Sequence, residues 1–308
     1  MKKTSRPIVF FGTENFSAKS LRALIDADFE IAAVVTKPDS AQGRGKKIQS
    51  HPIKEIALAA NIPVWQPEKV LEISDNLKNL QSPVGILVSY GKLIPDSILD
   101  LFKPGIINIH PSLLPKYRGP SPIESAILNG DSQTGVSIMK LTKEMDAGPV
   151  YSQIKIDLKN DEYSEDLYET LAKKGAELLI DVLPSILDEQ LQATPQDEAD
   201  TSYCQLIEKH DGIIDWNKPA TTIEREVRAF HKWPKSRTKL GEVEVIITKA
   251  HIYDTEGTPG KPDIKDTDLI VYCGKNSLSI DAIQPLGKKE MPIQAFLAGY
   301  KNRLILEE

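Results

Sequence analysis

The first half of the chain alternates short apolar runs with stretches of helical periodicity, and this alternation restricts the fold more than any other feature. Residues 8–11 and 31–36 are apolar runs of strand length, whereas residues 17–27 place their leucines on one side, as an amphipathic helix does. Further strands are predicted at 64–65, 85–89 and the run ending at Asn108, and further helices at 52–60, 68–80 and 95–101. Nearly continuous apolar strands between helices predict an α/β fold: a Rossmann-like, mostly parallel sheet with helices on both faces.

The second half of the chain changes character twice. Residues 135–141 and 150–156 alternate apolar and polar side chains, as strands near a sheet edge do, and residues 164–189 form a long amphipathic helix. A polar stretch then gives way to short β-rich runs at 243–248, 251–253, 269–273 and 278–283, which indicate a small β-barrel or sandwich. We therefore expect a first domain over 1–189, a linker over 190–207 and a second domain over 208–308.

Composition excludes several classes of protein. The apolar runs are far shorter than the roughly 20 residues of a membrane span, and the N-terminus lacks the apolar stretch of a secretory signal. Cys204 and Cys273 are isolated, which indicates reduced thiols rather than a disulfide framework or a zinc site. The net charge of −6 means that a polyanionic partner would have to bind local basic patches. We expect a monomer in a bacterial-type cytoplasm.

Polar side chains at the end of one predicted strand mark a candidate active site. Asn108 and His110 are two positions apart, so in a strand they share one face, and ligands of parallel α/β sheets bind beyond the carboxyl ends of the strands. Asp146 follows in the run Met145–Gly148, and a carboxylate beside an imidazole can fix its orientation. An amide donor, an imidazole and a carboxylate suit a site that polarises a carbonyl and moves a proton.

His110 and Ser112 admit other interpretations, and the fold pattern admits another class of cofactor. A backbone carbonyl could hold His110 in a purely structural strand cap. The single Gly12 after the first strand is too few glycines for a dinucleotide-binding turn, which disfavours a nicotinamide or flavin cofactor. Ser112 lacks the pattern of a nucleophile elbow, so we do not expect it to attack the substrate.

Two basic segments are candidates for contact with a polyanion. Arg44, Lys46 and Lys47 lie in a glycine-containing polar loop at 37–50, where they could hold phosphates or simply keep the loop soluble. Residues 225–239 carry six basic side chains against the single acidic Glu226, with Phe230 and Trp233 interleaved. Basic and aromatic side chains together are typical of a nucleic-acid surface, although the aromatics could equally belong to the core.

The chain resembles the folate-dependent formyltransferases. The resemblance rests on NIHPSLLPKYRG at 108–119 and MDAG at 145–148. Further motifs resemble the methionyl-tRNA formyltransferase family in particular: FFGT at 10–13, GRGKK at 43–47, SYG at 89–91, IDW at 214–216, RAF with WP over 228–234, and GKK at 287–289.

The resemblance implies a Rossmann-like catalytic domain followed by an OB-like β-barrel that binds tRNA. It implies transfer of a formyl group from the co-substrate 10-formyltetrahydrofolate to the α-amine of initiator methionyl-tRNA, without a metal. The catalytic residues would be Asn108, His110 and Asp146. The folate would contact Ser112, Leu113, Leu114 and Pro115, and the tRNA would contact Arg44, Lys46, Lys47, Arg228, Lys232 and Lys235.

Two other functions remain open from the sequence alone. The first domain could formylate a small amine such as an amino sugar nucleotide, but the basic segments count against this alternative. The second alternative is a non-catalytic RNA-binding protein with a degenerate folate domain. The intact trio of Asn108, His110 and Asp146 counts against this alternative.

Overall fold

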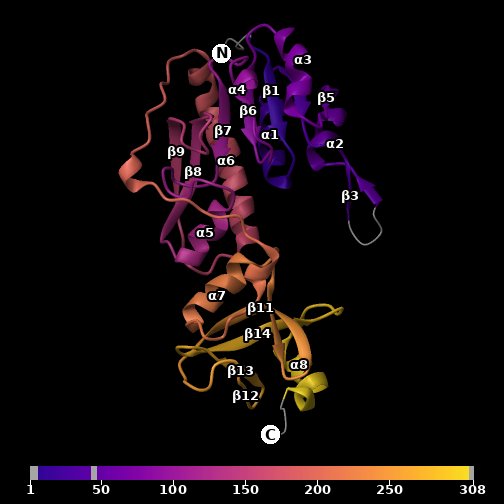
Figure 1. The fold of residues 1–308 in the computed structure, drawn as a ribbon, viewed down its shortest axis with the longest axis vertical. Coiled ribbons are helices and arrows are strands. Elements are labelled where there is room, and N and C mark those ends of the chain that lie inside the picture. The colour runs from indigo at the N-terminus through magenta and orange to yellow at the C-terminus, as the bar shows by residue number, and fades with distance from the viewer. Residues whose placement is uncertain (1–5, 43–46, 305–308) are drawn as a thin grey trace. The chain divides into compact units, whose positions relative to one another are not determined.

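Seven strands form a single sheet in the first part of the chain. The computed structural model describes residues 6–42 and 47–304, which divide into two units. Unit 1 comprises Met1–Pro122, Thr134–Ile156 and Tyr168–Cys204, and unit 2 comprises Ile123–Gln133, Asp157–Leu167 and Gln205–Glu308. The strand order in unit 1 is β5-β2-β1-β6-β7-β8-β9 (Figure 1). Its strands are β1 (Ile8–Gly12), β2 (Ile31–Val35), β5 (Val64–Trp65), β6 (Val84–Val88), β7 (Ile106–His110), β8 (Gln133–Lys140) and β9 (Val150–Asp157).

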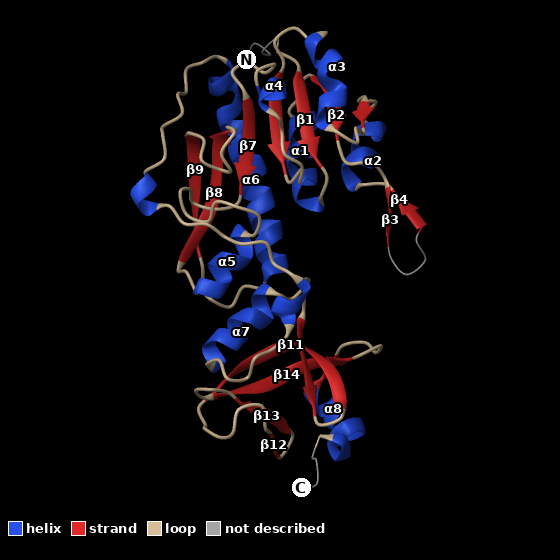
Figure 2. Ribbon diagram, viewed as in Figure 1, coloured by secondary structure: helices blue, strands red, loops and turns tan. Residues whose placement is uncertain are grey.

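This sheet confirms the predicted fold class. The strands β5, β2, β1, β6 and β7 pair in parallel, and β8 runs antiparallel to β7. Helices alternate with these strands along the chain (Figure 2). The helices are α1 (Asn15–Asp26), α2 (Pro52–Ala59), α3 (Ser74–Lys78), α4 (Asp96–Leu99), α5 (Pro122–Asn129) and α6 (Ser164–Leu187), with a 3-10 turn η1 (Val70–Ile73) before α3.

Both faces of the sheet are buried. One face contributes Phe11 and Ile106 to a core cluster that includes Leu77 of α3 and Ile98 of α4. On the other face, α6 crosses β7 so closely that a Cβ on Gly175 would lie 2.8 Å from Ile109. Because side chains alternate along a strand, Asn108 and His110 project from the same face as Ile106 and away from α6.

Unit 2 is built on an antiparallel six-stranded sheet. Its strands are β10 (Ser236–Leu240), β11 (Val243–Tyr253), β12 (Pro262–Lys265), β13 (Asp268–Tyr272), β14 (Ser277–Pro285) and β15 (Met291–Pro292). They pair in the order β10-β11-β14-β13-β12, with β15 on β14. The unit also contains the helices α7 (Ala220–Ala229) and α8 (Ile293–Tyr300), the 3-10 turns η3 (Lys209–Gly212) and η4 (Lys301–Arg303), and nearly all of α5.

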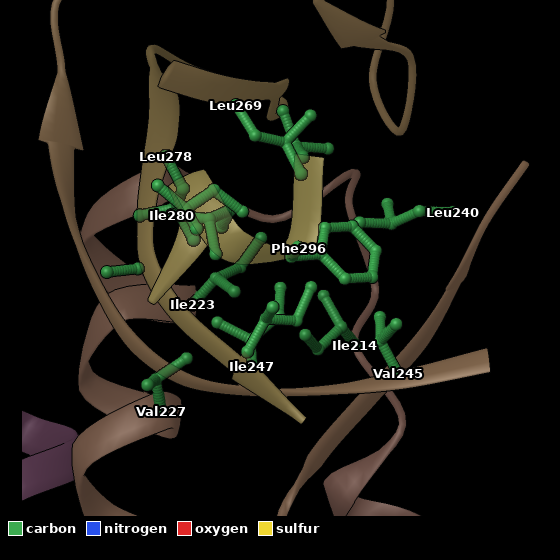
Figure 3. Packing of buried hydrophobic residues seen from close by; sticks show 14 of the residues in the cluster. Ile214, Ile223, Val227, Leu240, Val245, Ile247, Leu269, Leu278, Ile280 and Phe296 are labelled. Carbon is green, nitrogen blue, oxygen red and sulfur yellow. The ribbon is translucent and has the colours of Figure 1, made fainter. Parts of the chain in front are cut away.

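A separate hydrophobic core fills unit 2. Ile223 and Val227 of α7, Ile247 of β11, Ile280 of β14 and Phe296 of α8 belong to one buried cluster (Figure 3). The unit therefore has a core of its own, as an independent domain does.

Three elements differ from the sequence expectation. The strands expected at 243–248 and 251–253 are one strand, β11, because irregular pairing with β14 around Lys249 interrupts the alternation without ending the strand. The helix expected at 68–80 is the turn η1 followed by the single-turn helix α3. The loop expected at 37–50 contains a short hairpin, β3 (Ser40–Gln42) with β4 (Lys47–Gln49).

Residues 190–204 of the expected linker belong to unit 1 and are hydrogen-bonded to the rest of that unit. Thr194 pairs with Val150 of β9, and Arg118 pairs with Tyr203 through a backbone bridge. A short 3-10 turn, η2 (Glu198–Asp200), lies between these contacts. Among the helices that the structure describes, none combines the length and apolarity needed to cross a lipid bilayer.

Candidate active site

The strand β7 ends in the two polar residues of the candidate site. Asn108 is 6% exposed and His110 is 4% exposed, so both side chains are withdrawn from bulk water. Every other residue of β7 is also buried, which fixes the strand firmly in the sheet. Polar groups buried at this depth require partners, and those partners define the site.

His110 lies between a carboxylate and a backbone carbonyl. Its Nε2 is 2.9 Å from the carbonyl oxygen of Tyr117, and its Nδ1 is 3.7 Å from Oδ2 of Asp146. A carbonyl oxygen can only accept a hydrogen bond, so Nε2 must carry the proton that it donates. Nδ1 is then the nitrogen at which His110 can gain or lose a proton, and it faces the carboxylate of Asp146.

Asp146 is held in a backbone conformation that residues other than glycine adopt uncommonly. Its φ is +49°, in the left-handed region, where Asp and Asn are tolerated better than most residues. Its Oδ2 accepts a hydrogen bond of 2.8 Å from the backbone N–H of Gly119. Nearby, Gly148 approaches β8 so closely that a Cβ there would lie 1.8 Å from the carbonyl oxygen of Lys140. The left-handed backbone at Asp146 and the crowding at Gly148 therefore explain the residue types at these two positions of the turn.

The amide of Asn108 differs from the other two groups. Within residues 6–42 and 47–304, no side-chain hydrogen bond of Asn108 is found, although the residue is buried. The group is thus available to donate to a ligand at the end of β7.

The turn after β7 is fixed by buried hydroxyl groups. Ser112 is fully buried, and its Oγ donates to the carbonyl of Lys116 at 2.6 Å. Ser137 of β8 donates to the carbonyl of Ser112 at 2.6 Å and accepts from the N–H of Leu114 at 3.1 Å. Gln153 of β9 donates to the carbonyl of Leu114 at 2.8 Å. Ser112 thus stabilises the turn. Of residues 112–115, Leu113 and Pro115 are half-buried, and the other two are buried.

A network around Arg118 is a feature that sequence reasoning missed. Arg118 is 1% exposed, and its guanidinium donates to Gln196 and to Glu198. Gln196 in turn donates to the backbone carbonyls of Asp146 and Gly148. The hydrogen bond to Glu198 raises the pKa of Arg118 further. Residues 196–198 lie in a polar segment with no periodicity, so no local pattern distinguishes them from a solvated linker.

The first basic segment lies mostly outside the described residues. Arg44 and Lys46 fall within residues 43–46, which the structure does not describe. Lys47 begins β4, but its side chain is likewise outside the description.

The second basic segment separates into groups with different environments. Arg228 is 4% exposed, and its Nε and Nη2 donate to the two carboxylate oxygens of Glu224 at 2.6 and 2.9 Å. Its Nη1 also donates to the carbonyl of Glu162 at 3.1 Å. Lys232 is exposed and lies 2.7 Å from Glu165. Lys235 is half-exposed, and no ion pair of its ammonium group is found among the described residues.

Comparison with known proteins identifies the family. The sequence model of "Formyl transferase" matches residues 6–183, and that of "Formyl transferase, C-terminal domain" matches residues 206–301. The chain belongs to the formyl transferase family. The candidate site at the end of β7 and the network around Arg118 both lie in unit 1, and the first match covers His110, Arg118 and Asp146.

Members of the family resemble the chain over nearly its whole length. Methionyl-tRNA formyltransferase of Sulfurihydrogenibium sp. is 40% identical over 302 residues, covering 96% of this chain and 97% of the relative. Methionyl-tRNA formyltransferase of Streptococcus sanguinis is 39% identical, with 97% of each chain covered. An N-formyltransferase from Helicobacter canadensis, solved with folinic acid and dTDP-3-aminofucose, shares the fold with a TM-score of 0.69 at 18% identity, covering 90% of this chain and 98% of that one.

Proposed function

We propose that this protein transfers the formyl group of 10-formyltetrahydrofolate to the α-amine of methionine on initiator methionyl-tRNA. The observation that carries the proposal is the arrangement at the end of β7. There, an amide with no partner found among the described residues lies two positions before a histidine held between a carboxylate and a carbonyl. Full-length similarity to methionyl-tRNA formyltransferases supports the choice of substrate.

Asn108 is the proposed stabiliser of the developing negative charge. Attack of the neutral amine on the formyl carbon forms a new C–N bond and moves an electron pair onto the formyl oxygen. The side-chain amide of Asn108 donates a hydrogen bond to that oxygen. Such a donor is most effective in a site that excludes water, and Asn108 is buried.

His110 and Asp146 are the proposed proton-handling pair. Because Nε2 donates to Tyr117, Nδ1 is the nitrogen that accepts the proton released by the attacking amine. The carboxylate of Asp146 then stabilises the imidazolium ion, as a charge at 3.7 Å does in a buried site. The electron pair on the formyl oxygen then re-forms the carbonyl, the C–N bond to the folate breaks, and the departing nitrogen takes up the proton that the His110 imidazolium releases.

The remaining contacts follow the sequence expectation with two changes. We propose that the turn Ser112, Leu113, Leu114 and Pro115 contacts the folate, chiefly through Leu113 and Pro115, because Ser112 is buried and donates to Lys116. Arg44, Lys46 and Lys47 are proposed to contact tRNA, together with Lys232 and Lys235. The proposed tRNA surface leaves Arg228 out, because its guanidinium is buried and paired. No metal takes part, and a monomer in the bacterial cytoplasm is the proposed form.

A substrate comparison tests the proposal. The protein is assayed with 10-formyltetrahydrofolate and, in parallel, initiator methionyl-tRNA, elongator methionyl-tRNA, free methionine and an amino sugar nucleotide. We expect formylation of the initiator methionyl-tRNA far above that of the other three. Comparable turnover of free methionine or of the sugar nucleotide would overturn the tRNA assignment. Absence of any formyl transfer would favour a binding protein instead.

A further inference from the structure

A buried arginine outside the proposed catalytic trio organises the segment that follows α6. Arg118 lies in the turn after β7, eight residues beyond His110, and is among the largest fully buried side chains of the protein. Its guanidinium donates from Nε and Nη2 to Oε1 of Gln196 at 3.0 and 2.9 Å. It also donates from Nη2 and Nη1 to the two carboxylate oxygens of Glu198 at 2.8 and 3.2 Å. A planar guanidinium with this many acceptors is fixed in one orientation.

The orientation of Gln196 follows from these contacts. Arginine has no acceptor, so the oxygen of the Gln196 amide must face Arg118 and its nitrogen must face the other way. There Nε2 donates to the carbonyl oxygens of Asp146 and Gly148, both at 2.7 Å. Carbonyl oxygens only accept, so the opposite amide orientation would lose all four hydrogen bonds. The amide therefore joins Arg118 to the Asp146 turn in a single defined arrangement.

The Asp146 turn depends on contacts of this kind. The φ of +49° at Asp146 is uncommon for a residue with a side chain, and such conformations persist where surrounding contacts enforce them. Gln196 binds the turn on both sides of Ala147, while Gly119 binds the carboxylate itself. The distance between Asp146 and Nδ1 of His110 thus depends on the backbone that Gln196 holds.

We propose that Gln196, oriented by Arg118, is a positioning residue for catalysis that holds the carboxylate of Asp146 toward His110. The proposal rests on the function proposed above for His110 and Asp146. It makes residues 196–198 part of the active-site machinery rather than a passive connection. Glu198, whose pKa is lowered chiefly by its hydrogen bond to Arg118, closes the other side of the guanidinium.

The test uses the full chain and two substitutions of Gln196. Gln196→Glu keeps the acceptors for Arg118 but removes the donors to the turn, and Gln196→Met removes both without adding charge. We expect kcat for formylation of initiator methionyl-tRNA to fall by roughly 10- to 100-fold in both variants, as small misplacements of catalytic groups do. The KM for 10-formyltetrahydrofolate should change little. Gln192→Glu and Gln192→Met are the matched controls, because Gln192 is exposed and donates to the carbonyl of Glu189.

A double-mutant cycle separates positioning from folding. Gln196→Met is combined with Asp146→Asn, which removes the charge that Gln196 is proposed to place. If Gln196 acts through Asp146, the second substitution adds little to the loss caused by Asp146→Asn alone, whereas an independent structural defect multiplies it. Should one Gln196 variant fail to fold, the other carries the same comparison.

The outcomes distinguish this inference from the function on which it rests. A wild-type protein that does not formylate methionyl-tRNA, or an Asp146→Asn variant of unchanged kcat, would overturn the proposed function and this inference with it. If both of those results are as expected, an unchanged kcat in Gln196→Met, or multiplicative losses in the cycle, would overturn the positioning role alone.

Discussion

At the scale of single residues, the site departs from what stability alone would select. Asn108 is buried and lacks a hydrogen-bond partner among the described residues, and Asp146 adopts a left-handed conformation. Uncommon backbone conformations cost stability, and they gather where a function needs them. His110, in contrast, has the carbonyl contact that the structural interpretation of this residue anticipated. That contact does not compete with the proton transfer proposed for His110, because it selects the tautomer that leaves Nδ1 facing Asp146.

Replacement of Asn108 by leucine should separate activity from stability. Asn108→Leu removes the proposed donor to the oxyanion, so kcat should fall by about 10²–10³-fold. The same change removes a buried amide, so the thermal midpoint should stay equal or rise. Steady-state kinetics and a thermal melt of the same preparation measure both effects. Asn302→Leu, at an exposed position of η4, should leave kcat unchanged, and a large fall in the midpoint of Asn108→Leu would contradict the argument.

At the scale of elements, the helix α7 contains Arg228, which the sequence suggests for the tRNA surface but which is buried and paired in the structure. Arg228 is held by Glu224 one turn earlier and by the carbonyl of Glu162. Arg228→Met leaves the partly buried carboxylate of Glu224 unpaired. The free energy of unfolding should therefore fall by about 3 kcal/mol. The affinity of this variant for tRNA, measured on the folded fraction, should be retained. Lys235→Met is the matched control, and we expect the reverse pattern for it: weaker tRNA binding and unchanged urea denaturation.

Glu226 in the same helix gives a pH-dependent test. Burial raises the pKa of Glu226 above its ordinary value of 4.5, despite a hydrogen bond of 2.6 Å from Lys218. A carboxyl group whose pKa is higher in the folded state stabilises the fold at low pH. It loses that contribution as the pH rises through 4.5 and then through the raised folded value. Glu226→Gln removes this titration, so wild type should lose stability relative to the variant as the pH rises from 4.5 through the raised pKa of Glu226. Urea denaturation of both proteins at several pH values measures the difference, and the opposite slope would show that the ion pair with Lys218 dominates.

The elements also show where sequence reasoning is sufficient. The strand β7 and its two polar residues follow from the alternation of side chains, and the parallel order of the sheet follows from the apolar runs between helices. The continuity of β11 does not follow, because the irregular pairing at Lys249 depends on the partner strand β14. The role of residues 196–198 does not follow either, since their partners are Arg118, about 80 residues earlier, and the Asp146 turn. Long-range polar contacts of this kind leave no periodicity in the sequence.

At the scale of the whole molecule, charge restricts how a tRNA can be bound. The net charge of −6 repels a polyanion at long range, so attraction must come from local groups of basic residues. Of the proposed tRNA residues, Lys232 lies 2.7 Å from Glu165, and Lys235 has no ion pair among the described residues. Lys232 must therefore exchange its contact with Glu165 for one with a phosphate when tRNA binds. Of these two lysines, Lys235 is therefore the one from which a direct phosphate contact is more expected.

The salt dependence of tRNA binding measures these contacts one at a time. Each phosphate neutralised by a basic side chain contributes about 0.7–0.9 to the slope of log K against log salt concentration. The binding constant for initiator methionyl-tRNA should therefore fall steeply with sodium chloride, and Lys235→Met should reduce the slope by about one such increment. The KM for 10-formyltetrahydrofolate should change far less, because a small ligand displaces few counterions. Arg228→Met should keep the wild-type slope because its guanidinium is paired within the protein. An equal loss of slope in Arg228→Met and Lys235→Met would show that the paired arginine also reaches the tRNA.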